Sequence, residues 1–336
     1  MPSSKHSILV VGGGSIGERH VRCFQSTGRA DVTLCEINSE VRNRVANECS
    51  LTQSFDDFDK AVDSNPDGIV ICTPAHLHVS MAIQVAEAGI HLLIEKPLST
   101  SLDGIDRLLS VIAEKQLLAG VAYVSRCHPA LCEMRASIHS GRFGQPVQLV
   151  GTSGQHFPLY RPAYREIYYA DRATGGGAIQ DALTHMINAA EWLIGPVTKL
   201  AADCDHQVLE GVEIEDTVNV IARHGATMAS YSLNQYQFPN ESSTTVICER
   251  GATKFESHKH RWLSSSNPGD DWREESSFSI LRDDLFVSQA NAFLDVLEGK
   301  AKPACSIEAA LQTLRVNLAI LNAAESRRWE TVTKVV

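Results

Sequence analysis

The stretch SILVVGGGSIGERHVRCFQST, residues 7–27, decides the fold of the N-terminal half. An apolar run ends in three glycines and leads directly into a segment with a helical pattern. Gly12, Gly14 and Gly17 fit the spacing G-x-G-x-x-G, and a second strand-like run, VTLCE, follows at residues 32–36. A strand, a glycine turn, a helix and another strand form a βαβ unit, the context in which this spacing indicates dinucleotide binding.

Each glycine of this loop has its own task. Gly12 permits a tight turn, Gly14 lets a pyrophosphate approach the backbone, and Gly17 lets the helix pack closely on the strand. The helix N-terminus supplies N–H donors and a partial positive charge for the phosphates. We therefore expect a cofactor-binding loop formed by Gly12, Gly14, Ser15, Ile16 and Gly17.

Glu36 ends the second strand of this unit. At this position a carboxylate hydrogen-bonds the adenosine ribose hydroxyls and repels a 2′-phosphate, which favours NAD over NADP. The alternative is a solvated acid at a strand end. Arg42 lies close enough in sequence to serve a 2′-phosphate, so NADP stays open.

The alternation continues along the chain. Apolar runs at 68–74, 91–97 and 118–124 alternate with helical patterns at 75–89 and 101–116. This order predicts an α/β fold with a parallel, doubly wound Rossmann sheet, in which ligands bind beyond the C-terminal ends of the strands. The clusters with polar side chains expected at those ends contain Thr73 and Pro74, Glu95 and Lys96, and Tyr123.

Lys96 follows one of these strands and precedes a proline that restrains the backbone. Hydride transfer from a secondary alcohol builds negative charge on the substrate oxygen, and a fixed ammonium stabilises that charge. A lysine at a strand end can also simply extend into solvent. Its place at the cofactor edge of the sheet favours catalysis.

The stretch GGGAIQDALTHMI, residues 175–187, is the second centre of interest. Asp181 and His185 are four residues apart, so an α-helix places both on one face. A neutral imidazole is suited to take a hydroxyl proton near neutral pH. The glycines would let the backbone approach substrate or cofactor. The alternative is a helix cap followed by a surface ion pair.

The segment LYRPAYREIYYADRATGGG, residues 159–177, precedes this helix. Its tyrosines and arginines suit a polyol or an anionic sugar. The alternative is a structured loop stacked on its own aromatic rings. The candidate substrate-binding residues are Arg161, Tyr164 and Arg165, with Tyr123 and Arg126 as weaker ones.

The C-terminal half changes pattern. Strand-like runs at 146–156, 198–207, 216–224, 228–237, 243–251 and 252–258 predict a large, mostly antiparallel sheet with one covered face. The pattern of residues 264–277 is typical of a loop, and the patterns of residues 285–299 and 307–326 are typical of helices. We expect a Rossmann domain over 1–125 and an α+β substrate-binding and oligomerisation domain over 126–336.

The composition restricts the function. The 336 residues carry a formal net charge of −10 and no basic cluster, which argues against nucleic acid as a partner. We find no secretory signal and no apolar run long enough to span a bilayer, so no membrane partner is expected. Nine cysteines without a C-x-x-C pair suit a reducing compartment, which predicts a cytoplasmic location. No metal site is predicted.

Several motifs together resemble the glucose–fructose oxidoreductase/inositol dehydrogenase (Gfo/Idh/MocA) family. They are the glycine loop, T-P-x-x-x-H at 73–78, A-G-x-H-x-x-x-E-K-P at 88–97 and G-G-G-x-x-x-D-x-x-x-H at 175–185. The resemblance covers nearly the whole chain. It implies that Lys96 is catalytic, that Asp181 and His185 complete the catalytic site, and that His78 lies in a loop beside the nicotinamide.

The resemblance also implies an open-faced sheet whose outer face forms a homodimer or homotetramer, and a terminal helix packed on the first domain. Many members carry an acid three residues after the histidine, where this chain has Asn188. We interpret Asn188 as a changed substrate contact.

These observations predict an NAD(P)-dependent oxidoreductase that moves hydride between nicotinamide and a secondary alcohol or ketone of a sugar, inositol or sugar derivative. Two alternatives are an NAD-dependent glycosidase that uses transient oxidation and a regulator that binds dinucleotide without chemistry. A regulator would not need Lys96, Asp181 and His185, and all three are present.

Overall fold

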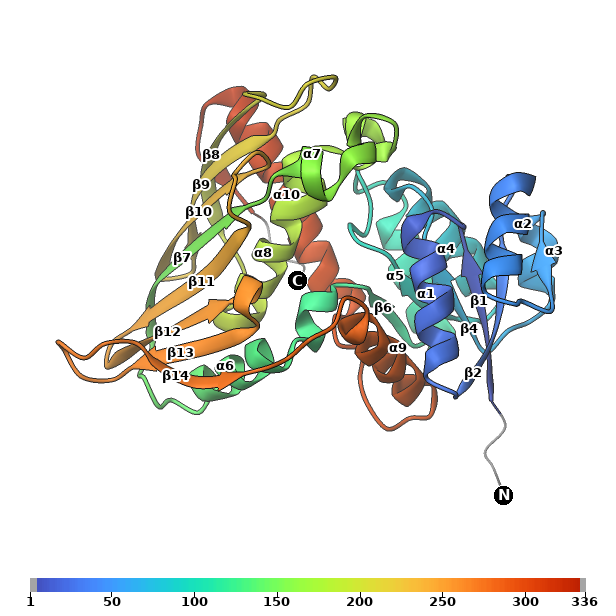
Figure 1. The fold of residues 1–336 in the computed structure, drawn as a ribbon, viewed down its shortest axis with the longest axis horizontal. Helices are drawn as coiled ribbons and strands as arrows, with labels where there is room; N and C mark the ends of the chain where they lie inside the picture. Colours follow the sequence, from blue (N-terminus) through green and yellow to red (C-terminus); the bar gives the residue numbers. More distant parts are fainter. Residues whose placement is uncertain (1–4, 333–336) are drawn as a thin grey trace. The chain divides into compact units, whose positions relative to one another are not determined.

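The computed structural model describes residues 5–332 (Figure 1). The chain divides into two compact units, and each is described by itself. The first holds the residues up to Cys127 together with Leu281–Ala310, and the second holds His128–Ile280 and the chain from Leu311 onward. The first unit therefore includes helix α9 (Asp284–Leu297), whereas most of the last helix, α10 (Ile307–Ser326), belongs to the second. The packing of the terminal helix on the first domain stays a prediction.

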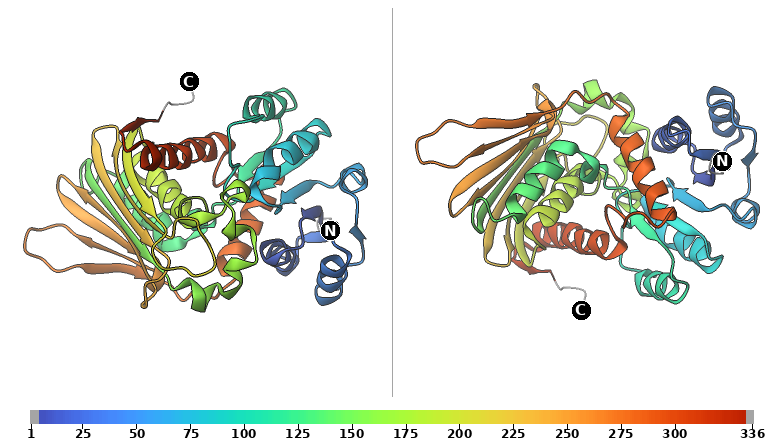
Figure 2. Two further views of the ribbon diagram at one scale, coloured as in Figure 1. Left: turned by 90° about the horizontal axis from the view of Figure 1, so that it is seen from above. Right: turned by 90° about the horizontal axis from the view of Figure 1, so that it is seen from below.

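The first unit is built on a six-stranded sheet in the order β3-β2-β1-β4-β5-β6. Every neighbouring pair is parallel, which confirms the predicted doubly wound α/β sheet. The central strands are apolar because both faces are covered by helices (Figure 2). The strands are β1 (His6–Val11), β2 (Ala30–Cys35), β3 (Ser54–Phe55), β4 (Gly68–Ile71), β5 (His91–Ile94) and β6 (Ala119–Val121).

The helices of this unit each follow a strand. Phe24 of α1 meets Phe293 of α9 edge to face, with ring centroids 6.1 Å apart, so α9 completes the apolar layer beside α1. The helices are α1 (Ser15–Ser26), α2 (Ser39–Glu48), α3 (Phe58–Asp63), α4 (His78–Glu87), α5 (Ile105–Glu114) and α9.

Helices α2 and α3 are absent from the sequence-based expectation. Helix α2 is mostly polar and buries only Val45, so it has no apolar periodicity to detect. Its start is nevertheless encoded locally, because the Asn38 side chain accepts hydrogen bonds from the Glu40 and Val41 N–H groups.

The second unit contains a nine-stranded sheet in the order β14-β13-β12-β11-β7-β10-β9-β8-β15. Only the β7–β10 pair is parallel, so the sheet is mixed and mostly antiparallel as predicted. The strands are β7 (Pro146–Gly154), β8 (Lys199–Asp205), β9 (Thr217–His224), β10 (Thr227–Asn234), β11 (Glu241–Cys248), β12 (Gly251–Glu256), β13 (Arg261–Ser265), β14 (Arg273–Ser277) and β15 (Glu330–Thr331).

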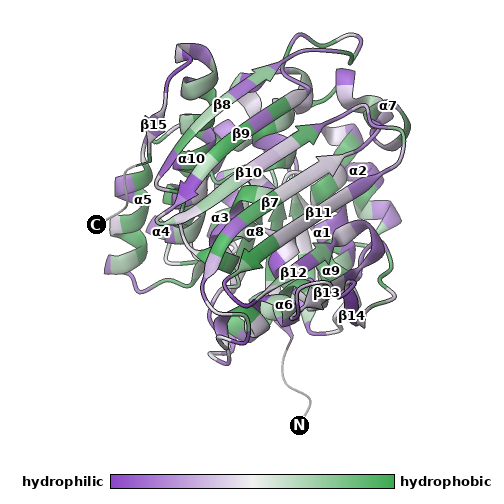
Figure 3. Ribbon diagram, turned by 90° about the vertical axis from the view of Figure 1, so that its left-hand side faces the viewer, coloured by the Kyte–Doolittle hydropathy of each residue, from purple (hydrophilic) through white to green (hydrophobic). Residues whose placement is uncertain are grey.

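One face of this sheet is covered by α6 (Pro129–His139), α8 (Thr184–Ile194) and α10, and the other is open (Figure 3). Leu149 and Val220 of the covered face join Ile187 of α8 and Ile320 of α10 in one apolar core. Along β9 buried and exposed residues alternate, as a strand with one covered face requires.

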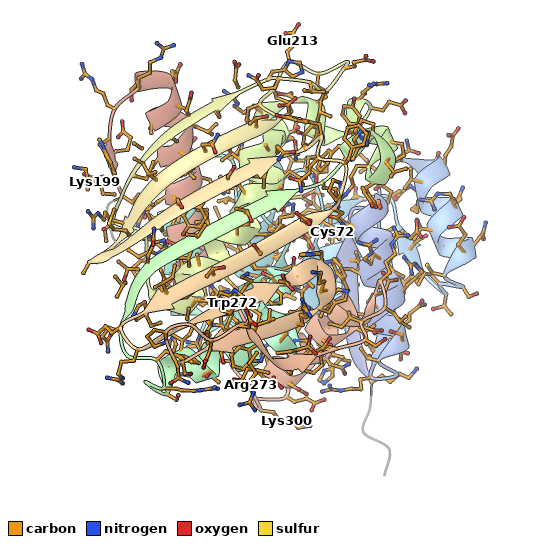
Figure 4. All side chains as sticks on the ribbon, turned by 60° about the vertical axis from the view of Figure 1, so that its left-hand side comes forward. Cys72, Lys199, Glu213, Trp272, Arg273 and Lys300 are labelled. Carbon is orange, nitrogen blue, oxygen red and sulfur yellow. The ribbon has the colours of Figure 1, made fainter. Side chains whose placement is uncertain are left out.

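The loop expected over 264–277 is wrong in part. Residues 261–265 and 273–277 pair as the antiparallel strands β13 and β14. Polar side chains in β14 hide the strand pattern because this edge strand has little to bury. The Lys254 ammonium lies 4.5 Å from the ring centroid of Trp272, a residue labelled in Figure 4 beside Arg273.

Within residues 5–332, no helix is both long and apolar enough to cross a membrane. Most cysteines are core residues, as expected. The buried ones are Cys23, Cys35, Cys49, Cys72, Cys248 and Cys305.

Candidate functional site

The glycine loop lies between β1 and α1, at the C-terminal edge of the parallel sheet. Gly12 has φ +96°, and a Cβ there would lie 2.9 Å from the Cys72 carbonyl oxygen. A Cβ at Gly17 would lie 1.8 Å from the Gly12 carbonyl oxygen, so the helix packs on the loop without room for a side chain. A Cβ at Gly14 would meet nothing within 4 Å. Internal packing therefore requires Gly12 and Gly17, while the space at Gly14 is left for a ligand.

Gly14 is also the N-cap of α1, and no side chain caps the helix. Ser15 and Ile16 are the first helical residues, next to this open space. The N-terminal N–H groups of a helix attract phosphate through hydrogen bonds and the helix dipole. The loop thus has the form that a dinucleotide pyrophosphate requires.

Glu36 lies at the end of β2, beside this loop. Its Oε2 accepts a 2.7 Å hydrogen bond from the Gly13 N–H, and its Oε1 accepts a 2.8 Å bond from the Asn38 N–H. These bonds orient the carboxylate, and each oxygen keeps a further lone pair for a ribose hydroxyl. Arg42 donates at 2.7 Å to the Glu36 carbonyl oxygen, so its guanidinium stabilises the turn after β2.

Ile37 is a residue that sequence reasoning missed. Its side chain is 81% exposed directly after Glu36, which is unusual for a large apolar residue. The available signal is its position in the sequence, directly after the acid that follows the glycine loop.

His78, which is 1% exposed, lies between the loops after β4 and β5. Its Nε2 lies 2.7 Å from the Thr73 carbonyl oxygen, and its Nδ1 lies 2.9 Å from the Pro97 carbonyl oxygen. Burial lowers the pKa of His78, so the ring is neutral at neutral pH. The imidazole therefore contacts backbone carbonyl groups, and Thr73 and Pro74 lie at the C-terminal edge of the sheet.

Glu95 and Lys96 follow β5 at the same edge. Glu95 is 5% exposed; its Oε1 lies 2.7 Å from His20 Nε2, and its Oε2 accepts a 3.0 Å bond from the Lys96 N–H. Burial alone would raise the pKa of Glu95, but the His20 hydrogen bond and the Lys96 charge outweigh it and hold that pKa below its usual value. His20 is a second residue that sequence reasoning missed.

Tyr123 and Arg126, the weaker candidates for substrate contact, are both buried. Tyr123 is 1% exposed, and Arg126 is 8% exposed and donates at 3.1 Å to the Ala304 carbonyl oxygen. These contacts give Arg126 a role within the first unit, in fastening the chain that leads into α10.

The second candidate region begins with a turn of π-helix, Ile179–Leu183, from which α8 continues. The sequence predicts a regular α-helix here. Asp181 therefore lies in an i→i+5 turn, a feature frequent at functional sites, and His185 lies in the first turn of the α-helix that follows. Asp181 is 6% exposed and its Oδ1 accepts a 2.7 Å bond from the Tyr168 hydroxyl, while His185 is partly exposed.

The three glycines before this turn are explained by packing within the second unit. A Cβ at Gly176 would lie 2.2 Å from the Tyr169 carbonyl oxygen, and one at Gly177 would lie 2.3 Å from Glu215 Oε1. Gly175 and Gly177 also have positive φ. The close approach that these glycines permit is thus to the unit's own chain.

Asn188 lies on the face of α8 that packs on α10. Its side chain is fully buried and donates at 3.0 Å to Thr313 Oγ1 of α10. Thr184, which lies one turn before Asn188 on α8, accepts a 2.9 Å hydrogen bond at its Oγ1 from Asn317 of α10. The structure gives Asn188 a role in joining two helices; its interpretation as a substrate contact stays a prediction.

The tyrosine-rich segment is largely a small aromatic core. Tyr164 and Tyr169 are each 1% exposed and pack with Phe157. The Tyr164 hydroxyl and Arg165 Nε both donate to the Glu210 carbonyl oxygen at 2.7 Å. Tyr164 and Tyr169 thus stabilise a structured loop, and Arg161 and Arg165 are exposed members of the predicted set.

The described residues contain no group of three or more His, Cys, Asp or Glu side chains that could hold a metal ion. The first unit thus offers a glycine loop, an oriented acid and a lysine at one sheet edge. The second offers a carboxylate and an imidazole at the start of one helix. A glycine loop followed by an acid at the next strand end is suited to a dinucleotide, and an imidazole can accept or donate a proton.

Comparison with known proteins agrees with this geometry. Residues 6–123 match the family described as "Oxidoreductase family, NAD-binding Rossmann fold", and residues 132–254 match "GFO/IDH/MocA C-terminal domain". The predicted NAD-binding Rossmann domain is thereby confirmed.

Among curated relatives, levoglucosan dehydrogenase of Pseudarthrobacter phenanthrenivorans is 26% identical over 206 residues, which cover 58% of this chain and 53% of the relative. The chain thus spans about half the length of this relative. The 1,5-anhydro-D-fructose reductase of Ensifer adhaerens is 24% identical, with 94% and 95% covered. A solved structure titled "Levoglucosan dehydrogenase, complex with NADH" shares the fold, with a TM-score of 0.90 at 20% identity and coverage of 99% of this chain and 100% of that one.

The two matches together account for most of both halves of the chain, in the order that the sequence motifs predict. The chain therefore belongs to the Gfo/Idh/MocA oxidoreductase family.

Proposed function

We propose that this protein is an NAD-dependent oxidoreductase that transfers hydride between nicotinamide and a secondary alcohol or ketone of a sugar, inositol or sugar derivative. The observation that carries the proposal is the position of Lys96, at the same sheet edge as the glycine loop and Glu36. Membership of the family, and relatives named for levoglucosan and 1,5-anhydro-D-fructose, support the choice of substrate class.

The residues fit the cofactor. Gly14 leaves open space at the helix N-terminus, and the oriented Glu36 carboxylate keeps acceptor capacity for ribose hydroxyls. When bound, NAD supplies a nicotinamide ring that accepts or returns hydride. The protein would hold its pyrophosphate through Gly12, Gly14, Ser15, Ile16 and Gly17, and its nicotinamide half beside Thr73, Pro74, Glu95 and Lys96.

The remaining roles concern protons and charge. The Lys96 ammonium stabilises negative charge on the substrate oxygen, and His185 takes the hydroxyl proton in oxidation or returns it in reduction. Asp181 orients the base or binds the substrate, and Tyr168 holds the Asp181 carboxylate through its hydroxyl. Arg161, Tyr164, Arg165 and Asn188 remain proposed substrate-side residues.

The test is a panel of sugars, inositols, uronates and nucleotide sugars, including levoglucosan and 1,5-anhydro-D-fructose, assayed with NAD and NADP by absorbance of the reduced nicotinamide. Turnover of one class supports the proposal. Tight NAD binding without turnover of any panel member would favour the regulator, and cleavage of a glycoside with non-exchanging NAD would favour the glycosidase.

Glu36→Ala should weaken NAD binding by about 10- to 150-fold, because a hydrogen bond to a charged group is worth about 1.5–3 kcal/mol. Wild-type protein should bind NAD more tightly than NADP, since Glu36 repels a 2′-phosphate. Calorimetric titration with both cofactors measures the two effects. Glu40→Ala removes the same charge from an exposed site on α2 and is the matched control. Equal or tighter NADP binding by the wild type contradicts this assignment.

We also propose that the open face of the nine-stranded sheet forms a homodimer or homotetramer contact. The strand registers align Ala201, Ile221, Ser230, Val150 and Thr245 in one row across five strands. The row is uncharged, and Ile221 is 53% exposed within it. Figure 3 shows this face of the sheet toward the viewer.

Ile221→Lys should raise the dissociation constant of the oligomer at least tenfold, about 1.4 kcal/mol, because an unpaired ammonium is costly to bury. Size-exclusion chromatography with light scattering over a dilution series measures the shift. Leu102→Lys places the same charge at an exposed site of the first unit and should leave the mass unchanged. A monomeric wild type refutes the contact outright.

Finally, we propose a cytoplasmic location, which rests on the nine cysteines without a C-x-x-C pair and on the nicotinamide chemistry.

A further inference from the structure

Two buried histidines hold the residues on either side of Lys96. His20 of α1 contacts the Glu95 carboxylate, and His78 of α4 contacts the Pro97 carbonyl oxygen. We propose that His20 and His78 are positioning residues that fix the backbone of Lys96 relative to the cofactor-binding helix. The inference rests on the proposed function of Lys96 and goes beyond it, because neither imidazole is assigned a part in the reaction.

The His20 arm is a relay of two hydrogen bonds. His20 is fully buried, its Nε2 lies 2.7 Å from Glu95 Oε1, and Glu95 Oε2 accepts the Lys96 N–H at 3.0 Å. The imidazole meets Phe286 edge on, with ring centroids 5.8 Å apart, and it also packs against Phe24. Packing on two aromatic rings restricts rotation of the imidazole, so the Glu95 carboxylate has a fixed partner.

The second ring nitrogen of His20 indicates which tautomer is present. Nδ1 is buried and has no hydrogen-bond partner. A proton on Nδ1 would be a buried donor without an acceptor, so the favoured form carries its single proton on Nε2. A neutral His20 thus donates to an ionised Glu95, and the pair leaves one negative charge beside the lysine.

The His78 arm holds the other side. Its ring lies between the Thr73 and Pro97 carbonyl oxygens, at 2.7 and 2.9 Å, and so packs between the loop after β4 and the loop after β5. A neutral imidazole carries one N–H and donates to one of these carbonyl groups. Lys96 therefore lies between Glu95, which is bonded to His20 of α1, and Pro97, whose carbonyl oxygen is in contact with His78 of α4.

The location of His20 connects Lys96 to the cofactor-binding helix. It stands three residues after Gly17, on the helix whose N-terminus receives the pyrophosphate. The same rigid helix would thus locate the phosphates and, through Glu95, the lysine. A displacement of about 1 Å in a catalytic group can lower a rate about a hundredfold, so such coupling has a measurable effect.

The first test compares His20→Leu and His78→Leu with His224→Leu. His224 is a matched control because it is 5% exposed and bridges Gly195 and Tyr231 through both ring nitrogens, in the other unit. We expect kcat to fall about 10- to 100-fold in the first two variants, with KM and the NAD dissociation constant changed less than about threefold. His224→Leu should lower the melting temperature without this change in kcat. His20→Gln keeps an amide donor near the position of Nε2. Its kcat should therefore be at least tenfold higher than that of His20→Leu.

The second test places His20→Leu and His78→Leu in a Lys96→Met background. Positioning residues act through the lysine, so the losses should not add, and each double variant should turn over at about the rate of Lys96→Met. Full additivity, or a kcat loss equal to that of His224→Leu, overturns the proposal. If His20→Leu fails to fold, His20→Asn, whose shorter amide cannot reach Glu95, replaces it.

A third readout needs no substrate. The Lys96 N–H is bonded to Glu95, so hydrogen exchange of residues 91–98, followed by mass spectrometry, should be at least tenfold faster in His20→Leu than in the wild type or His224→Leu. Unchanged exchange overturns the proposal. This measurement separates it from the proposed function, because loss of protection without turnover on any substrate would support the positioning of Lys96 and refute only its role in hydride transfer.

Discussion

Lys96→Met should lower kcat by at least about a hundredfold and leave NAD binding close to that of the wild type. The methionine keeps the length of the side chain and removes the ammonium. Loss of one group that stabilises developing negative charge typically costs 10²–10³ in kcat, about 2.7–4 kcal/mol. The backbone bond from Lys96 to Glu95 does not need the side chain, so the loop keeps that anchor.

The experiment requires the true substrate, single-turnover kinetics and calorimetric NAD titration of the same preparation. Lys60→Met is the control, because Lys60 is an exposed lysine of α3 in the same unit. Near-normal turnover of Lys96→Met would assign the lysine a structural role. A parallel loss of NAD affinity would instead indicate that its charge serves the cofactor.

His185→Ala should lower kcat for oxidation by about 10²–10⁴-fold, the usual contribution of a general acid–base group. An imidazole titrates near neutral pH, and only its neutral form can take a proton. Wild-type oxidation should therefore rise as the pH increases through the imidazole's titration range and then level off. The variant should lose this rise, because the group that titrates is gone.

Profiles of kcat against pH between 5.5 and 8.5 test this assignment. His139→Ala is the control, since His139 is an exposed histidine of α6. An unchanged profile in His185→Ala would exclude His185 as the base. In that case Asp181, whose carboxylate is held by the Tyr168 hydroxyl, becomes the next residue to replace.

The sequence alone was sufficient for the parts of the site that are local. Gly12 and Gly17 are five residues apart, and a Cβ at Gly17 would collide with the Gly12 carbonyl oxygen. The need for glycine at these positions therefore arises within one short segment of the chain. The alternation of apolar runs with helical patterns likewise predicts the parallel sheet, since each strand and its helix are neighbours in sequence. The motif around Lys96 could be placed at a strand end for the same reason.

The predictions that differ from the structure concern elements with little local signal. Helix α2 is polar, and β14 is an edge strand with polar side chains, so neither shows apolar periodicity. The π-turn at Ile179–Leu183 is another case. Its sequence suits an ordinary helix, whereas the tight packing of Gly176 and Gly177 just before it is set by Tyr169 and Glu215.

By itself, then, the sequence determined the Rossmann sheet, the cofactor loop and the residue types of the chemistry, because these depend on short-range spacing and strand period. Only the tertiary structure decided which side chains are hydrogen-bonding or packing partners within the chain. It joined His20 to Glu95 across 75 residues and Asn188 to Thr313 across 125, and it buried Tyr164 in an aromatic core. The physical reason is that a buried polar group must find a hydrogen-bond partner wherever packing brings one, and packing between distant segments leaves no periodic trace in the chain.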